Sequence, residues 1–367
     1  MISELRKEIS NFFDINDNKI IFFERAFMSL FCLFKFLSKQ SKRKKILFTS
    51  STCQSPVLAC YFANLKPIFS DISLDNFLMN NHETLKIIEN EKNDILAVVY
   101  VYLFGHTPDG KSLNAIKSKC QSNNIFLIED VAQAFGAMCG EIKCGLIGDY
   151  SIFSFGYSKQ IDGNGGGFLI NNRDINQNKY LNKIKINYPY INEHQSINFK
   201  ENFYEIRKKS LENINYLNDF MSLFDQSKVL YFKKINPDWD IIYHKLITYN
   251  NDNMTEIRND NASKYEYEII KSGLDEFISI PKLNSDYSIY RYTILLEKRH
   301  SINLSNILRN NEIDCSNLYI PIGNIFSGEN FPNSITLYQS SINLWVSPVA
   351  FAKNFHKTID IFKKYFE

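Results

Sequence analysis

Short apolar runs alternate with segments of helical periodicity through the first half of the chain. The apolar runs at residues 45–49, 95–103 and 125–130 contain few polar interruptions. Such runs are typical of strands that are buried on both faces of a parallel sheet. Strands that alternate with helices favour an α/β sheet covered by helices. We therefore predict an α/β fold with a mostly parallel sheet.

The second half of the chain has a different pattern. Residues 172–226 are polar and predicted to be mostly helical. Beyond Trp239 follow a strand-like stretch at 288–296, a helical stretch at 304–311 and an amphipathic helix that ends near Phe366. A chain of 367 residues exceeds what one hydrophobic core usually serves. We predict a large domain over residues 1–235 and a smaller C-terminal α+β domain over residues 236–367.

The composition excludes several classes of partner. A formal net charge of +2 gives no reason to expect nucleic acid or an anionic membrane. The most apolar stretch, residues 27–37, is far shorter than the ~20 residues that span a bilayer. The first ten residues contain no apolar signal core, so we expect a cytoplasmic protein. The seven cysteines have no repeated spacing and are expected to be reduced. Cys139 and Cys144 lack a second Cys/His pair, so no metal site is expected.

One lysine stands between a serine and a cluster of glycines in the stretch FSFGYSKQIDGNGGG, residues 153–167. A P-loop would place the glycines before the lysine and a Ser or Thr after it, which is not the order around Lys159. A dinucleotide fingerprint would open a helix, but the strand-like residues 168–171 follow here. Both phosphate-binding motifs are therefore excluded.

The predicted strands bring three reactive side chains to one edge of the sheet. Asp130 closes one strand, Ser154 lies near the end of the next, and Lys159 follows in the loop. Ligands of open α/β sheets bind at the carboxyl ends of the strands. Pyridoxal phosphate (PLP) requires a lysine for its Schiff base and a carboxylate beside its pyridine nitrogen. Its phosphate requires hydroxyl and backbone N–H donors. The three residues therefore predict a PLP site.

At these residues the chain resembles the DegT/StrS-type PLP-dependent aminotransferases of carbohydrate biosynthesis. The resemblance is carried by IEDVAQAFGA (residues 128–137) and CGLIGDYSIFSFGYSKQIDGNGGG (residues 144–167). Weaker similarity covers SSTCQSPVLACYFANLKPIFSDIS, VYLFGHTPDG and LWVSP, so the resemblance spans nearly the whole chain. It implies a fold type I aminotransferase.

The resemblance implies a role for each matching residue. Lys159 matches the lysine that holds PLP as a Schiff base and later moves the proton between the two carbon centres. Asp130 matches the carboxylate under the pyridine nitrogen. Gln133 matches the side chain that contacts the phenolic oxygen of the ring, and Ser154 matches the phosphate-binding hydroxyl.

Two further pairs match the family with departures. Arg25 and Ala26 align with a turn of small residues whose amides hold the phosphate. Arg25 departs from this pattern because it is not a small residue. We interpret it either as a phosphate contact or as a surface charge. Thr52 and Cys53 align with the loop beneath the ring, where most members have an aromatic residue instead of Cys53. We interpret His106, in LFGHTPDG, as structural.

The resemblance also implies the reaction and its partners. L-Glutamate is the usual amino donor, and most relatives aminate keto-sugars carried on nucleotides, here for bacterial surface or capsular carbohydrate. Each family site lies at a homodimer interface, which a Gly-x-Asn-x-Arg element crosses. Only Asn187 and Tyr188 resemble that element here. A small phosphorylated ketone, such as dihydroxyacetone phosphate giving serinol phosphate, therefore remains an alternative acceptor, with Arg25, Arg291 and Tyr319 as candidate contacts.

Two alternatives to an aminotransferase remain within the same fold. Some members replace the lysine with histidine and act as sugar dehydratases, and others act as non-catalytic PLP-binding regulators. Retention of Lys159 argues against both. The glycines after Lys159 are expected to give the loop backbone clearance where it passes the cofactor and a neighbouring subunit.

Overall fold

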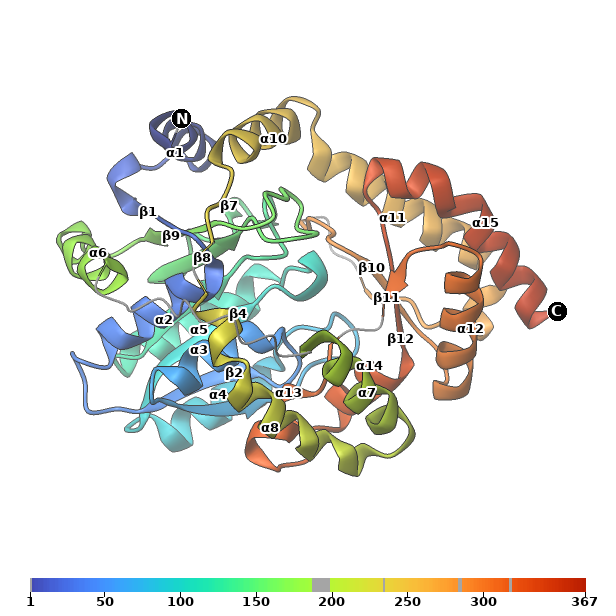
Figure 1. Ribbon diagram of the computed structural model, residues 1–367, viewed down its shortest axis with the longest axis horizontal. Coiled ribbons are helices and arrows are strands. Elements are labelled where there is room, and N and C mark those ends of the chain that lie inside the picture. The colour runs from blue at the N-terminus through green and yellow to red at the C-terminus, as the bar shows by residue number, and fades with distance from the viewer. Residues whose placement is uncertain (1, 187–198, 234, 283–285, 317–318) are drawn as a thin grey trace.

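The structure is a computed structural model that describes residues 2–186, 199–233, 235–282, 286–316 and 319–367. A large domain is built around a seven-stranded sheet, and a smaller C-terminal domain contains a three-stranded sheet (Figure 1). The predicted α/β class is confirmed. The expected Asn187 element lies outside the described residues.

The large sheet is parallel except for one strand. β9 runs antiparallel to both of its neighbours, β8 and β1, and the other pairs are parallel. In spatial order the strands are β1 (Ile20–Phe23), β9 (Gly167–Asn171), β8 (Tyr150–Ser154), β5 (Phe126–Asp130), β4 (Ile95–Val101), β2 (Lys45–Thr49) and β3 (Lys66–Ser70). Every residue of β4 is buried, as its unbroken apolar sequence predicts.

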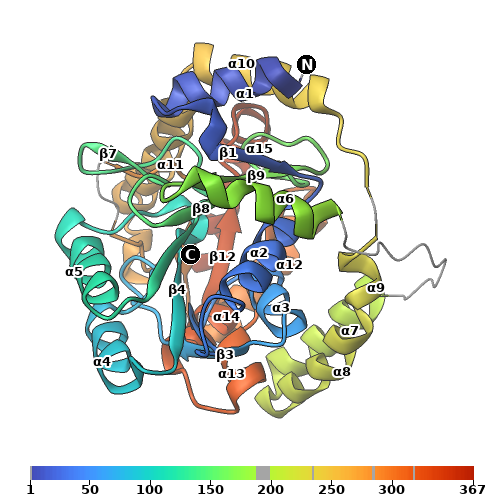
Figure 2. The same cartoon turned by 90° about the vertical axis from the view of Figure 1, so that its left-hand side faces the viewer.

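Helices cover both faces of the large sheet (Figure 2). One face packs against α2 (Ala26–Leu37), α3 (Gln54–Phe62), α6 (Asn178–Ile186), α7 (Phe199–Glu212), α8 (Asp219–Gln226) and the short α9 (Lys228–Tyr231). The other face packs against α1 (Ile2–Phe13), α4 (Asn81–Glu91), α5 (Gly110–Ser122) and α10 (Trp239–Asn251). Ten of the twelve residues of α2 are buried, because α2 lies between the sheet and other helices.

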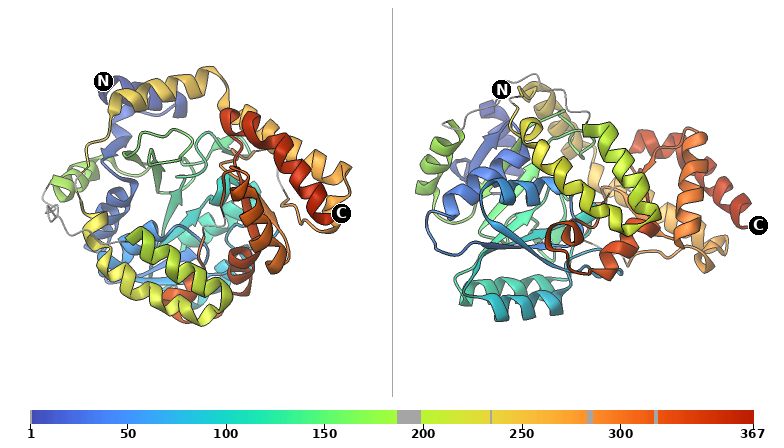
Figure 3. Two further views of the ribbon diagram at one scale, coloured as in Figure 1. Left: turned by 45° about the vertical axis from the view of Figure 1, so that its right-hand side comes forward. Right: turned by 60° about the horizontal axis from the view of Figure 1, so that its bottom comes forward.

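The C-terminal domain forms a second layer beside the large domain, drawn in orange and red in Figure 3. Its antiparallel sheet has the order β10 (Tyr292–Leu295), β12 (Ser341–Leu344) and β11 (Cys315–Ser316). Its helices are α11 (Met254–Lys271), α12 (Lys298–Asn310), α14 (Pro332–Ser340) and α15 (Pro348–Phe366), whereas α13 (Ile322–Ser327) packs on β3 and α8 of the large domain. A short hairpin of β6 (Met138–Cys139) and β7 (Ile142–Lys143) belongs to the large domain.

The two domains share segments near the expected boundary at residue 235. α10 follows that boundary but packs on α1, and its Ile242, Leu246 and Tyr249 belong to the core of the large domain. α11 instead packs on α15 in the core of the C-terminal domain. The core of the large sheet therefore extends past residue 235, to Tyr249 on one face and again to residues between 320 and 338 on the other.

All seven cysteines fall in the described part of the chain, and each is a free thiol. Among the described residues, no group of three or more His, Cys, Asp or Glu side chains is arranged to hold a metal ion. Over the same residues, no helix combines the length and the apolar character that crossing a membrane requires.

Candidate active site

Two neighbouring parallel strands carry the predicted catalytic residues to one edge of the large sheet. Asp130 ends β5 and Ser154 ends β8, and Asp130 lies opposite Ile152 in the ladder between them. Lys159 follows in the loop that joins β8 to β9. These three side chains line one cavity of about 510 Å³. The other predicted cofactor contacts line it too: Gln133, Arg25, Ala26, Thr52 and Cys53.

Asp130 is a buried carboxylate with an unusual lack of partners. It is 6% exposed, and its Oδ1 accepts a hydrogen bond from the N–H of Ala132 at 3.1 Å. Burial raises the pKa of Asp130, while the Ala132 N–H and the charge of Lys159 lower it. A cation beside the carboxylate would offset the cost of burying its charge. A protonated pyridine nitrogen is such a cation.

Another wall of the cavity offers donors suited to an anion. Arg25 precedes α2, whose first N–H groups and dipole favour negative charge at Ala26. Arg25 Nε and Thr52 Oγ1 are buried without a hydrogen-bond partner in the described part of the protein. Ser154 Oγ accepts the N–H of Gly156 at 3.2 Å, which leaves its own proton to donate. These groups fit a phosphate.

Gln133 is fixed between two segments of the chain. Its Oε1 accepts the N–H of Phe104 at 2.8 Å, and its Nε2 donates to the hydroxyl of Tyr319 at 2.7 Å. Tyr319 thus supports a cavity residue but does not itself line the cavity. Burial raises the pKa of Tyr319 far above its ordinary value.

The glycines after Lys159 pass close to a later segment of the same chain, and their expected approach to the cofactor and to a neighbouring subunit stays a prediction. A Cβ on Gly165 would lie 2.8 Å from Ile235 Cδ1, and one on Gly166 would lie 3.2 Å from the ring of Trp239. Gly166 also has a φ of +86°, in the region that favours glycine. The close neighbours belong to the same chain, because residues 235–239 pass over the loop.

Tyr231 lies on the side of the cavity near Cys53. Cys53 stands at the position where most members of the family have an aromatic residue. The Tyr231 ring lines the cavity and packs on Phe27 with ring centroids 4.6 Å apart. Burial raises the pKa of Tyr231, so it stays a neutral phenol. The sequence pattern did not single out Tyr231, because it lies beyond the polar stretch 172–226 in a short apolar run without a motif.

The structure places two of the predicted residues behind the wall of the cavity. Arg291 is 5% exposed and stacks between the rings of Tyr290 and Trp345, with its Cζ 4.0 and 3.3 Å from their centroids. Its Nη1 donates to the carbonyl of Tyr290. Arg291 therefore contacts Tyr290 and, at 3.5 Å from its Nη2, the carbonyl of Ser158 beside Lys159, but it does not line the cavity. His106 is also buried, burial lowers its pKa to about 3, and it does not line the cavity.

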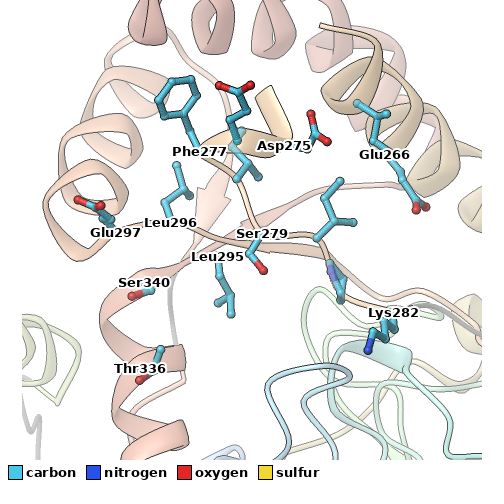
Figure 4. A pocket seen from close by; sticks show the side chains of 15 residues that line it. Glu266, Asp275, Phe277, Ser279, Lys282, Leu295, Leu296, Glu297, Thr336 and Ser340 are labelled. Atoms are coloured by element: carbon cyan, nitrogen blue, oxygen red, sulfur yellow. The ribbon is translucent and has the colours of Figure 1, made fainter. Parts of the chain in front are cut away.

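A second cavity, of about 820 Å³, lies on the C-terminal domain (Figure 4). The carboxylates of Glu266, Asp275 and Glu297 are among the side chains around it, with Lys282 at one end. An anionic cofactor would meet mostly like charges there. The cavity at Lys159 combines an amine, a buried carboxylate that accepts one hydrogen bond, and unpaired anion donors, and it fits PLP better than the second cavity does.

The chain has the fold of the fold type I aminotransferases. Solved structures share this fold. They include a DegT DnrJ EryC1 StrS aminotransferase from Brucella abortus (TM-score 0.72, 15% identity, 99% of this chain and 90% of that one). DesV from S. venezuelae has a TM-score of 0.74 at 15% identity over 100% and 89% of the two chains. A GDP-4-keto-6-deoxymannose-3-dehydratase has a TM-score of 0.70 at 14% identity over 98% and 92%.

One family model matches part of the sequence. The model of the DegT/DnrJ/EryC1/StrS aminotransferase family matches residues 28–187, which include Asp130, Gln133, Ser154 and Lys159. Residues 28–187 are similar to this family, as their motifs predict, and PLP is the cofactor that this similarity supports.

Curated relatives match over part of their length. GDP-perosamine synthase from Vibrio cholerae is 30% identical over 31% of this chain and 30% of its own length. The protein of that name from Escherichia coli O157:H7 is 30% identical over 36% and 35%. A dTDP-3-amino-3,6-dideoxy-alpha-D-galactopyranose transaminase from Aneurinibacillus thermoaerophilus is 31% identical over 30% and 29%. The matched segments thus span about a third of each relative.

Proposed function

We propose that the chain is a PLP-dependent aminotransferase that moves an amino group from L-glutamate to a keto-sugar carried on a nucleotide. The observation that supports this most is the shared cavity of Lys159 and Asp130, with the unpaired donors of Arg25 and Thr52 beside them. We further propose that the product enters bacterial surface or capsular carbohydrate, because sugar aminotransferases are among the relatives.

Each side chain has a separate task in this proposal. PLP, when bound, supplies an electron sink for the carbon from which a proton is removed. Lys159 Nζ holds the cofactor and carries that proton between the two carbon centres. Asp130 keeps the pyridine nitrogen protonated through its charge. Arg25, the N–H of Ala26 and Ser154 Oγ bind the phosphate. Gln133, fixed by Tyr319, orients the ring.

The placement of the cations favours the nucleotide-linked acceptor over a small phosphorylated ketone. The alternative acceptor, dihydroxyacetone phosphate, needs its own cation near the reacting carbonyl, with Arg25 and Arg291 as candidates. Arg25 lies at the end of the cavity that fits the cofactor phosphate, and Arg291 does not line the cavity. Neither is then free for a second phosphate.

The test is a pair of half-reactions followed in single turnover. The PLP form should convert to the pyridoxamine form with L-glutamate, and that form should then aminate a nucleotide-linked keto-sugar faster than dihydroxyacetone phosphate. The reverse preference, lost in Arg291→Ala, would support the small ketone and serinol phosphate. Failure of the glutamate step in protein that binds PLP would instead favour the dehydratase or the regulator.

The exposure of Tyr157 supports a homodimer, which we also propose. Tyr157 lines the cavity, yet it is 79% exposed. An aromatic side chain this exposed at the mouth of a site suits a contact with a second copy, and most oligomers are symmetric dimers. Sedimentation should give a dimer that Tyr157→Arg weakens, and a wild-type monomer would contradict it. The seven free thiols support a cytoplasmic location.

A further inference from the structure

Residues of the C-terminal domain form hydrogen bonds with the loop that carries Lys159. Gln160 Nε2 donates to the carbonyl and the hydroxyl of Ser288, at 3.0 and 2.7 Å. On the other side of the lysine, Ser158 Oγ and the Tyr290 hydroxyl are 3.0 Å apart. Both neighbours of Lys159 are therefore hydrogen-bonded to residues 288–290, which lie far away in the sequence.

Ser158 has a backbone conformation that needs such support. Its φ is +63°, in the left-handed region that non-glycine residues seldom adopt. Strained residues of this kind persist where the surrounding structure holds them, and they concentrate at functional sites. The hydroxyl of Tyr290 and Nη2 of Arg291, 3.5 Å from the Ser158 carbonyl, are the groups that contact Ser158 from the C-terminal domain.

Tyr290 also faces the lysine directly. Lys159 Nζ lies 5.2 Å from the centroid of the Tyr290 ring, within the range of a cation–π contact. The backbone of Tyr290 is fixed in turn, because Arg258 donates to the carbonyls of Ile289 and Tyr290 at 2.8 Å each. Burial raises the pKa of Tyr290, but the charges of Lys159, Arg291 and Arg258 and the bond with Ser158 together lower it.

We propose that Tyr290 is a positioning residue of the active site. Its hydroxyl holds Ser158 in the left-handed conformation and its ring faces the Lys159 amine, so the C-terminal domain sets the position from which the amine attacks the cofactor carbonyl. The inference rests on the proposed function, since it concerns the bond between Lys159 and PLP. Covalent attachment forms one C=N bond and releases one water.

The test measures that bond rather than turnover. Cofactor-free protein is mixed with PLP, and the linked fraction on Lys159 is trapped by borohydride at successive times and counted by mass spectrometry. Total bound PLP is measured in parallel. Tyr290→Phe keeps the ring and removes the hydroxyl. We expect the linking rate to fall about tenfold, the effect of one lost hydrogen bond on the geometry of attack, with total PLP binding changed much less.

The matched control is Tyr292→Phe. Tyr292 is a fully buried tyrosine two residues away, and its hydroxyl has no hydrogen-bond partner within the described ranges. It lies in the core of the C-terminal domain, so its variant should link PLP at the wild-type rate. Equal rates in Tyr290→Phe and Tyr292→Phe would overturn the inference.

A double-mutant cycle tests the route through Ser158. If the hydroxyl of Tyr290 acts on the loop through Ser158, Ser158→Ala should slow linking similarly, and the double variant should be no slower than either single one. Additive losses would overturn this route. Wild-type protein that binds PLP but never links it to Lys159 would contradict the proposed function itself, an outcome distinct from failure of the Tyr290 effect.

Discussion

Glu129 and Asp130 are consecutive buried carboxylates of β5 that the protein treats in opposite ways. Glu129 is 0% exposed and accepts hydrogen bonds from the Tyr102 hydroxyl and from the N–H groups of Gly145, Ile147 and Gly148. Asp130, on the other face of the strand, accepts one from Ala132 and borders the cavity with Lys159. Glu129 is satisfied by the fold, whereas Asp130 is left to be satisfied by a ligand.

The contrast shows how a functional carboxylate is distinguished from a structural one. Burial raises the pKa of both groups, so burial alone does not separate them. The partners do, because four donors hold Glu129 in place and order the loop that contains Gly145 and Gly148. Removing the charge of Asp130 should therefore affect catalysis, whereas removing the charge of Glu129 should affect stability.

The largest effect is expected from Asp130→Asn, in the glutamate half-reaction. The substitution keeps the size of the side chain and removes the charge that keeps the pyridine nitrogen protonated. We expect a loss on the order of two to four decades in rate, comparable with losing a major electrostatic contribution to catalysis. Stopped-flow absorbance of the PLP form measures it. A rate near that of wild type would contradict the catalytic role of Asp130, which distinguishes it from the structural Glu129.

Glu129→Gln should instead change stability. Gln has one acceptor oxygen, and its amide N–H₂ would face backbone donors that need an acceptor. We expect a loss of roughly 1–3 kcal/mol for each donor left unpaired, measured by urea unfolding. The half-reaction rate per folded molecule should stay at the wild-type value. A large drop in that rate with unchanged stability would show that Glu129, and not Asp130, carries the catalytic charge.

The smallest effect is a pH dependence of stability at Asp130, which PLP should reverse. In cofactor-free protein the folded-state pKa of Asp130 lies above its ordinary value of 3.8. The stability from the neutral carboxyl is therefore complete below pH 3.8 and is lost as pH rises through the folded-state pKa. Asp130→Asn should gain stability relative to wild type toward neutral pH, a difference that PLP should reverse. Urea unfolding followed from pH 3.8 up to neutral pH measures this. A difference that is independent of pH and of PLP would contradict it.

The sequence patterns predicted the parts of the fold that depend on local order. The bounds of β2 and β9 agree with the predicted strands, and Asp130, Ser154 and Lys159 meet as strand order requires. β1 went unpredicted because its four apolar residues carry no periodicity and are defined only by pairing with β9. The packing of α10 on the large domain went unpredicted for a similar reason, since its contacts with α1 are distant in sequence.

The C-terminal wall of the site shows the same limit. Arg291 was selected as a cation, but its neighbour Tyr290 contacts the lysine loop, and nothing in the aromatic stretch SIYRYTILL separates Tyr290 from Tyr292. Tyr290 lies in the bend before β10 and Tyr292 is the first residue of β10, and this difference in backbone position decides which tyrosine faces Lys159 and which enters the core. The position of a side chain in the site is thus predictable where a motif fixes its spacing, as at Asp130 and Gln133. It is not predictable from the chemical type of the residue alone, as at Arg291.

The central claim is that Lys159 holds PLP in the cavity at the end of β8. Borohydride reduction of the protein with PLP, followed by proteolysis and mass spectrometry, tests it most directly. The cofactor should be fixed on the peptide that contains Lys159, and Lys159→Ala should lose it. An adduct on a different lysine, or none on wild-type protein saturated with PLP, would contradict the account.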